Sequence, residues 1–185
     1  CAAVSPRGRV LACGLHAITG GLGGLGLRAA ALLVEGGASG LVLASRSGRV
    51  VRDGQGLEAP LHSTSAVAAV LPSDSADGQD TSHLVTQGLL AGMLHASGVL
   101  RDTLLRALSA DDLEASYAPK AAGAAHVQAI LMRTPLEAFG LFSSEASTFG
   151  NFGQANYAAA NAYLDALATS RQRCGTIGSS LQIPA

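Results

Sequence analysis

The first stretch that could carry chemistry is TGGLGGLG at residues 19–26, in which Gly21, Gly23 and Gly26 match the pattern G-x-G-x-x-G. Glycines at these positions let the backbone approach a pyrophosphate, which then lies against the positive end of the following helix. The pattern follows an aliphatic segment at 15–18 and opens a helix-like segment, which is the context that such a site requires. We therefore predict a dinucleotide-binding turn; the alternative is a tight turn in an unrelated α/β fold.

A second candidate lies about 20 residues beyond the last glycine, where a dinucleotide site places an acid or an arginine near the ribose 2′ position. In this sequence that position holds Arg46, flanked by Ser45 and Ser47, and no Asp or Glu occurs between Glu35 and Asp53. A guanidinium with two neighbouring hydroxyls suits a 2′-phosphate, so the pattern favours NADPH over NADH. The alternative is a solvated arginine that follows a strand.

Four further residues have the types that proton transfer to a carbonyl group needs. Tyr157 and Asn161 are four residues apart and so share a helix face, and Ser144, next to Ser143, follows a predicted strand. Lys120 is the only lysine among 12 basic residues. An amine can have its pKa lowered, whereas a guanidinium stays protonated, so a proton relay tolerates lysine and not arginine. A single lysine is also compatible with an accident of composition.

Strand-like and helix-like segments alternate along the chain and would position these residues. Strands are predicted at 15–18, 40–45, 66–71, 89–96, 136–142 and 177–183, and helices at 24–34, 83–88, 109–132 and 157–173. Residues 74–79 are predicted as a loop, 57–61 as a helical fragment, and the long helix is expected to break near Pro119. Alternating strands and helices form a parallel sheet through right-handed crossovers. The predicted fold is a Rossmann-like, doubly wound α/β fold of about six strands in the order 3-2-1-4-5-6.

Composition excludes several classes of function. With 12 basic and 13 acidic residues and a net charge of −1, the chain has no basic stripe for nucleic acid or for an anionic membrane. The three cysteines and five histidines lack the spacing of a disulfide framework or a metal site, so we expect no metal and a reducing, cytoplasmic location. No apolar run approaches the roughly 20 residues that span a bilayer.

Taken together, these segments resemble the ketoreductase (KR) domain of polyketide synthases, within the short-chain dehydrogenase/reductase superfamily. The matching segments lie between about residue 14 and about residue 183, at 19–26, 45–48, 95–102, 118–123, 142–144 and 153–165. Most short-chain reductases place the lysine four residues after the tyrosine, whereas polyketide ketoreductases have Asn there and take the lysine from the preceding helix. This sequence shows that exchanged arrangement, with Asn161 and Lys120, and Ser144 lies 13 residues before Tyr157.

The resemblance implies NADPH-dependent reduction of a β-ketoacyl thioester, carried by an acyl carrier protein among other synthase domains, to a β-hydroxyacyl thioester. Tyr157 would donate the proton, Lys120 would stabilise the phenolate, Ser144 would hydrogen-bond the substrate oxygen, and Asn161 would hold Lys120 or a relay water. The implied cofactor-binding residues, which include an adenine-contacting pair at 74–75, are Thr19, Gly20, Gly21, Leu22, Gly23, Gly24, Leu25, Gly26, Ser45, Arg46, Ser47, Asp74, Ser75, His95, Ala96, Ser97 and Gly98.

The sequence also departs from the KR pattern. Residues 1–10, interpreted as a linker, stand where a KR has a structural subdomain, and no Trp-Gly and lid helix follow the sixth strand. We therefore expect residues 11–185 to be an incomplete catalytic KR subdomain, truncated at the C-terminal lid. A non-catalytic NADPH-binding or scaffold remnant stays open as the alternative. The segment Leu100-Arg101-Asp102, together with Phe149 where the opposite class has Trp, favours a D-hydroxy product.

Overall fold

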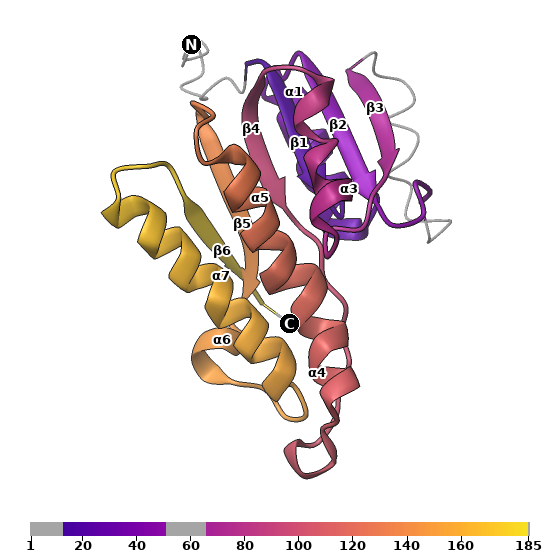
Figure 1. Cartoon of the computed structure of the whole chain (residues 1–185), viewed down its shortest axis with the longest axis vertical. Helices are drawn as coiled ribbons and strands as arrows, with labels where there is room; N and C mark the ends of the chain where they lie inside the picture. The colour runs from indigo at the N-terminus through magenta and orange to yellow at the C-terminus, as the bar shows by residue number, and fades with distance from the viewer. Residues whose placement is uncertain (1–12, 51–65, 185) are drawn as a thin grey trace.

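The computed structural model describes residues 13–50 and 66–184, which form a six-stranded parallel sheet flanked by helices (Figure 1). The strand order is β3-β2-β1-β4-β5-β6, as predicted. The strands are β1 (Leu15–Thr19), β2 (Gly40–Ser45), β3 (Val67–Pro72), β4 (Leu90–His95), β5 (Ala138–Ser144) and β6 (Ser179–Ile183). Because β1 pairs with both β2 and β4, the order reverses at β1, and this reversal opens a crevice at the carboxyl ends of the strands.

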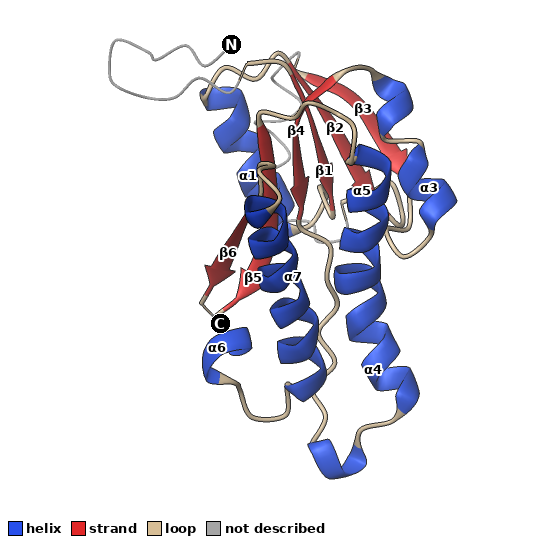
Figure 2. Cartoon of the chain, turned by 60° about the vertical axis from the view of Figure 1, so that its left-hand side comes forward, coloured by secondary structure: helices blue, strands red, loops and turns tan. Residues whose placement is uncertain are grey.

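Helices cover both faces of the sheet (Figure 2). They are α1 (Gly24–Glu35), α3 (Gly78–Ser82), α4 (Ala110–Tyr117), α5 (Gly123–Leu131), α6 (Ala146–Phe149) and α7 (Ala155–Arg173), with 3₁₀ turns η1 (Val85–Gln87) and η2 (Leu105–Ala107). A π-helical turn, η3 (Ala118–Ala122), joins α4 to α5. Helix α1 packs on one face, while α5 and α7 pack on the other.

Side chains of the central strands alternate between two apolar clusters, one on each face of the sheet. In β1, Ala17 belongs to the cluster under α5 and α7, whereas Ile18 belongs to the cluster under α1. In β2, Val42 and Leu43 divide in the same way. Burial on both faces explains why β2 is a continuous aliphatic run rather than an alternating one.

Several predicted boundaries differ from the structure. Residues 74–79 were predicted as a loop and 83–88 as a helix, but α3 begins at Gly78, because the Asp77 side chain accepts hydrogen bonds from the backbone N–H groups of Gln79 and Asp80. The stretch at 83–88 contains only the 3₁₀ turn η1. Helix α7 begins at Ala155, and β6 begins at Ser179. The linker at 1–10 and the helical fragment at 57–61 lie outside the described residues.

Near Pro119 the long helix is interrupted as an α-helix, as predicted, but its helical path continues from α4 through η3 into α5. Proline normally interrupts an α-helix since it lacks an N–H and its ring clashes with the carbonyl four residues back. In η3 the Gly123 N–H reaches the carbonyl of Ala118, five residues back, so the turn is wider there. A wider turn accommodates the proline ring without ending the helix.

Candidate active site

A cleft of about 610 Å³ lies where β1, β2 and β4 end. Predicted cofactor residues line much of it, namely Gly20, Leu22, Gly23, Gly24, Ser45, Arg46, Ser47, Ser75, Ala96, Ser97 and Gly98. Further lining residues, which the sequence interpretation missed, are Leu27, Arg49, Val50, Ser73, Val99 and Pro119. Most of these residues lie next to predicted site residues in the sequence, and that proximity is the signal from which they could have been found.

The glycine turn at the floor of the cleft needs its glycines for space. Gly20 has φ +66°, and a Cβ at this position would lie 2.6 Å from the carbonyl oxygen of Ala96. A Cβ on Gly26 would lie 2.7 Å from the Cα of Gly21, so only glycine lets α1 approach the turn. No side chain caps the first turn of α1, whose N-cap is Gly23, and that turn holds no acidic residue. Bare N–H groups at a helix start suit a pyrophosphate, so the turn fits a dinucleotide.

The loop after β2 brings two guanidinium groups to the cleft. Gly48 has φ +61° and donates its N–H to the carbonyl of Ser45, which closes a turn that places both Arg46 and Arg49 on the cleft wall. The Ser47 hydroxyl donates to the carbonyl of Arg49 and accepts from its N–H. The buried Ser45 hydroxyl has no hydrogen-bond partner within the described residues. Two cations beside an unpartnered hydroxyl fit a phosphate group.

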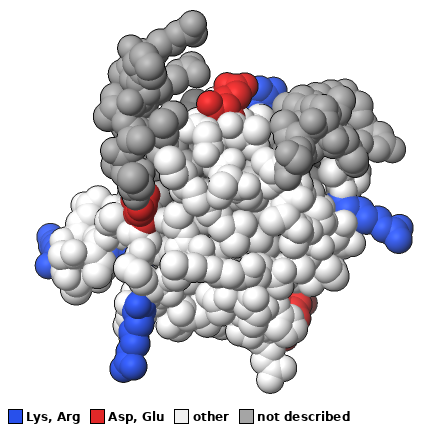
Figure 3. Space-filling view, turned by 90° about the horizontal axis from the view of Figure 1, so that it is seen from above, with Lys and Arg blue, Asp and Glu red and all other residues white. Residues whose placement is uncertain are grey.

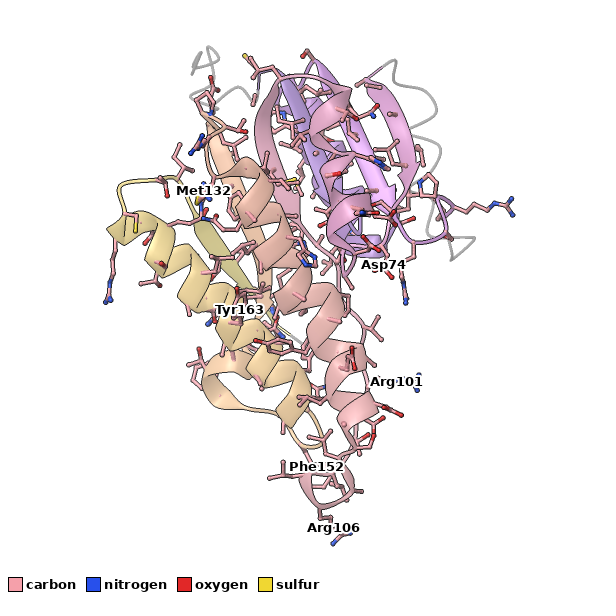
Figure 4. All side chains as sticks on the ribbon, in the orientation of Figure 1. Asp74, Arg101, Arg106, Met132, Phe152 and Tyr163 are labelled. Carbon is pink, nitrogen blue, oxygen red and sulfur yellow. The ribbon has the colours of Figure 1, made fainter. Side chains whose placement is uncertain are left out.

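Other predicted cofactor residues do not line the cleft: Thr19, Gly21, Leu25, Gly26, Asp74 and His95. Asp74 lies beside the carboxyl ends of the strands (Figure 4), where its side chain accepts from the N–H of Ala76. His95 is buried in the interior, with Nδ1 2.7 Å from the Thr19 hydroxyl oxygen and Nε2 2.9 Å from the carbonyl oxygen of Lys120. Neither residue is among those that line the cleft, although the sequence predicted both as cofactor-binding residues.

Lys120 and Tyr157 come together although 36 residues separate them in the sequence. The Lys120 Nζ lies 5.3 Å from the centroid of the Tyr157 ring and donates a hydrogen bond of 2.7 Å to the carbonyl of Phe142 at the end of β5. Gly98, on the cleft wall, contacts the lysine stem, because a Cβ there would lie 3.0 Å from Lys120 Cε. The amine therefore sits between the cleft, β5 and the phenol ring.

Burial changes the acid–base properties of this lysine. Lys120 is 4% exposed, and loss of solvation lowers the pKa of its amine to about 8, while the nearby carboxylate of Asp165 acts in the opposite direction. The amine remains mainly protonated at neutral pH, yet it releases its proton more readily than an exposed lysine. This is the property expected of a cation that supports proton transfer from a phenol.

Asn161 and the serines at the end of β5 complete the group. The Asn161 amide nitrogen donates to the carbonyl of Tyr157 (2.8 Å), while its side-chain oxygen is buried with no hydrogen-bond partner among the described residues. The Ser143 hydroxyl donates to the Asn161 carbonyl, and the Ser144 hydroxyl accepts from the N–H of Ala146. A buried acceptor without a donor fits a bound water or a cofactor hydroxyl.

Charged side chains and potential metal ligands are sparsely distributed over the part of the chain that the structure describes. The face of the molecule in Figure 3 carries only scattered charged side chains. Among residues 13–50 and 66–184, no group of three or more His, Cys, Asp or Glu residues is arranged to hold a metal ion. Within the same ranges, every helix is too short or too polar to cross a membrane.

Comparisons with known proteins agree with this site. The family model for the KR domain matches residues 14–185. Similar relatives include Polyketide synthase GfsA of Streptomyces halstedii, 44% identical over 170 residues, which are 89% of this chain and 2% of that protein. A protein of Aspergillus clavatus named 6-methylcalicylic acide synthase is 40% identical over 91% of this chain and 11% of its own length.

Solved structures of ketoreductases are also similar to this chain. The structure of A-type ketoreductases from a modular polyketide synthase superposes with a TM-score of 0.86 at 35% identity, covering 98% of this chain and 40% of that one. An NAD⁺-bound xylitol dehydrogenase, 18% identical with a TM-score of 0.81, shares the fold alone. The chain thus spans about two fifths of the length of the solved ketoreductase that it matches.

Proposed function

Since this chain belongs to the KR domain family of polyketide synthases, we propose that it reduces a β-ketoacyl thioester on an acyl carrier protein to a β-hydroxyacyl thioester, using NADPH. The observation that carries the proposal is the buried Lys120 amine, 5.3 Å from the centre of the Tyr157 ring and in contact with Gly98 on the wall of the cleft. The carrier protein and other synthase domains would be its partners, and a cytoplasmic location stays a prediction.

Tyr157 would give its phenolic proton to the carbonyl oxygen of the substrate. NADPH, when bound, supplies the hydride to the carbonyl carbon. A free phenol has a pKa of about 10 and is a weak acid at neutral pH, so it needs a nearby cation that stabilises the phenolate. The ammonium of Lys120 provides that charge, and its bond to the Phe142 carbonyl holds it in place.

Ser144 and Asn161 would assist the same proton transfer. The Ser144 hydroxyl, at the end of β5, would donate to the substrate oxygen as negative charge develops there, a contribution of about 3 kcal/mol for a well-aimed donor. The unpartnered side-chain oxygen of Asn161 would accept from a water or from Lys120, which keeps a proton relay in position.

The cleft residues would hold the cofactor. The glycine turn at 19–26 would take the pyrophosphate at the start of α1, and Arg46 with Arg49 would take the 2′-phosphate. Ser97 and Gly98 line the end of the cleft that adjoins Lys120. Arg46→Ala should raise the KM for NADPH about tenfold to a hundredfold, as expected for a charged hydrogen bond, without raising the KM for NADH.

The proposal is tested with the full-length protein, NADPH and a β-ketoacyl N-acetylcysteamine thioester, by following loss of NADPH absorbance. Turnover is expected, and Tyr157→Phe should lower kcat by about a hundredfold or more while NADPH affinity is unchanged. If NADPH raises the melting temperature but no thioester is reduced, the chain is a cofactor-binding scaffold instead. Chiral chromatography of the product then tests the predicted D-hydroxy configuration.

A further inference from the structure

The helix that carries Lys120 changes its winding at that residue. Residues 118–122 form the π-helical turn η3, between α4 and α5, and Lys120 lies at the middle of the turn. A π turn has poorer hydrogen-bond geometry than an α turn and persists where the surrounding structure compensates for it. The contacts that compensate should therefore also decide where the Lys120 side chain points.

Two carbonyl groups of this turn receive hydrogen bonds from outside the helix. The Ser75 hydroxyl, which follows β3, donates to the carbonyl of Pro119 over 3.1 Å. The His95 ring, at the end of β4, bonds the carbonyl of Lys120 itself over 2.9 Å. Because a carbonyl oxygen only accepts, Nε2 of His95 carries the proton, and its Nδ1 accepts from the Thr19 hydroxyl.

Close packing leaves these donors little freedom. His95 is completely buried and Ser75 is 5% exposed. Gly123, the residue that follows the turn, makes room for both, since a Cβ there would lie 3.0 Å from His95 Cε1 and 3.0 Å from Ser75 Cβ. Burial also lowers the pKa of His95 to about 4, so the ring stays neutral and keeps the same tautomer at neutral pH.

We propose that Ser75 and His95 are positioning residues for Lys120, which fix the π turn and thereby aim the amine at the Phe142 carbonyl and the Tyr157 ring. The inference deepens the proposed function and rests on it. It adds a role to the prediction from sequence, which placed both residues in contact with the cofactor; Ser75 does line the cleft, whereas His95 does not. Through Thr19, the contact of His95 also joins the lysine to the first residue of the glycine turn.

Steady-state kinetics and NADPH binding distinguish a role in positioning Lys120 from a role in cofactor binding. In the full-length protein, Ser75→Ala and His95→Asn should each lower kcat about tenfold, as expected for one lost buried hydrogen bond, with the Kd for NADPH changed by less than twofold. His95→Gln should restore most of kcat, because the glutamine amide N–H can reach the position of Nε2–H. A raised Kd for NADPH with unchanged kcat, or equal losses in the Gln and Asn variants, would overturn the proposal.

A matched control and a double-mutant cycle complete the kinetic test. Thr176→Val removes another side-chain hydroxyl, which donates to the carbonyl of Arg171 rather than to the π turn, and should lower stability but leave kcat within twofold. In a Lys120→Met background, Ser75→Ala should have no further effect on the residual rate. A tenfold effect that persists there would show that Ser75 acts independently of the lysine.

A measurement without turnover keeps this inference separate from the proposed function. The acetylation rate of the Lys120 amine by acetic anhydride, read by peptide mass spectrometry, should rise several-fold in Ser75→Ala and His95→Asn but not in Thr176→Val. If the wild type reduces no thioester, the proposed function fails while the labelling still tests the positioning. Equal labelling of Lys120 in all variants would overturn the positioning role.

Discussion

Replacing Lys120 with methionine should make the protein more stable and inactive at the same time. The lysine is 4% exposed, and burial lowers the pKa of its amine from 10.5 to about 8. Such a drop corresponds to about 3 kcal/mol of destabilisation while the amine is charged in both the folded and unfolded states. Methionine is unbranched and of similar length, so it fills the same space without the charge.

The size and sign of the effect depend on pH. Below about pH 8 the full penalty is present, and the lost hydrogen bond to the Phe142 carbonyl offsets about 1 kcal/mol of the gain, which leaves about 2 kcal/mol at pH 7. As pH rises from about 8 to 10.5, the folded wild type loses a proton that the unfolded chain keeps, so wild-type stability rises. The advantage of the variant should disappear near pH 9.5, estimated roughly from the same slope.

Urea unfolding followed by circular dichroism, at pH 7 and pH 9.5, measures this difference. Arg106→Met is the matched control, since Arg106 is exposed at the end of the molecule far from the sheet (Figure 4), and it should show no such pH dependence. A Lys120→Met variant that is no more stable than the wild type at pH 7, or whose advantage is the same at both pH values, would refute the reasoning.

Three further predictions concern other parts of the site. Ser144→Ala should lower kcat by about a hundredfold with little change in NADPH affinity, measured by steady-state kinetics and fluorescence titration. Gly26→Ala should destabilise the fold by about 1–3 kcal/mol and weaken NADPH binding, because its Cβ would lie 2.7 Å from the Cα of Gly21; thermal unfolding with and without NADPH checks this. Burial raises the pKa of Asp165, but bonds from Ser147, Ser180 and other side chains outweigh it and lower the pKa overall, so the stability from the carboxylate is present above about pH 4 and lost as pH falls through the folded pKa. Asp165→Asn should remove about 1–2 kcal/mol at pH 7 and flatten that acid limb in urea titrations.

The order of the strands could be predicted from sequence because the rules behind it are local and topological. Aliphatic runs such as 40–45 alternate with helical segments, and right-handed crossovers then allow few sheet orders. The glycine turn could be predicted for a similar reason, because its spacing reflects positions where a Cβ atom would clash with the neighbouring backbone. Arg49 was missed because the turn that brings it beside Arg46 depends on Gly48 and the end of β2.

The winding around Lys120 could not be predicted from the local sequence. Pro119 predicts an end to the helix, and the side chains that bond the carbonyls of the π turn are Ser75 and His95, which lie 44 and 25 residues from their partners in the sequence. The same tertiary contacts bury the His95 ring in the interior, although the family resemblance implied a contact with the cofactor, whereas Ser75 still lines the cleft. The direction of a buried side chain depends on its packing against residues that are distant in the sequence. The spacing of residues in a motif does not predict that packing.

The π turn also sets which genetic changes this segment tolerates. A π turn holds about one residue more than an α turn, so a single-codon deletion within 118–122 would convert the wide turn to a regular one and leave α4 and α5 in about the same relative orientation. The deletion would instead displace the side chains within the turn, so Lys120 would lose the position that it holds at the middle of the turn. Homologues should accordingly vary in length in the surface loops, while the number of residues between Ser116 and Gly123 stays constant.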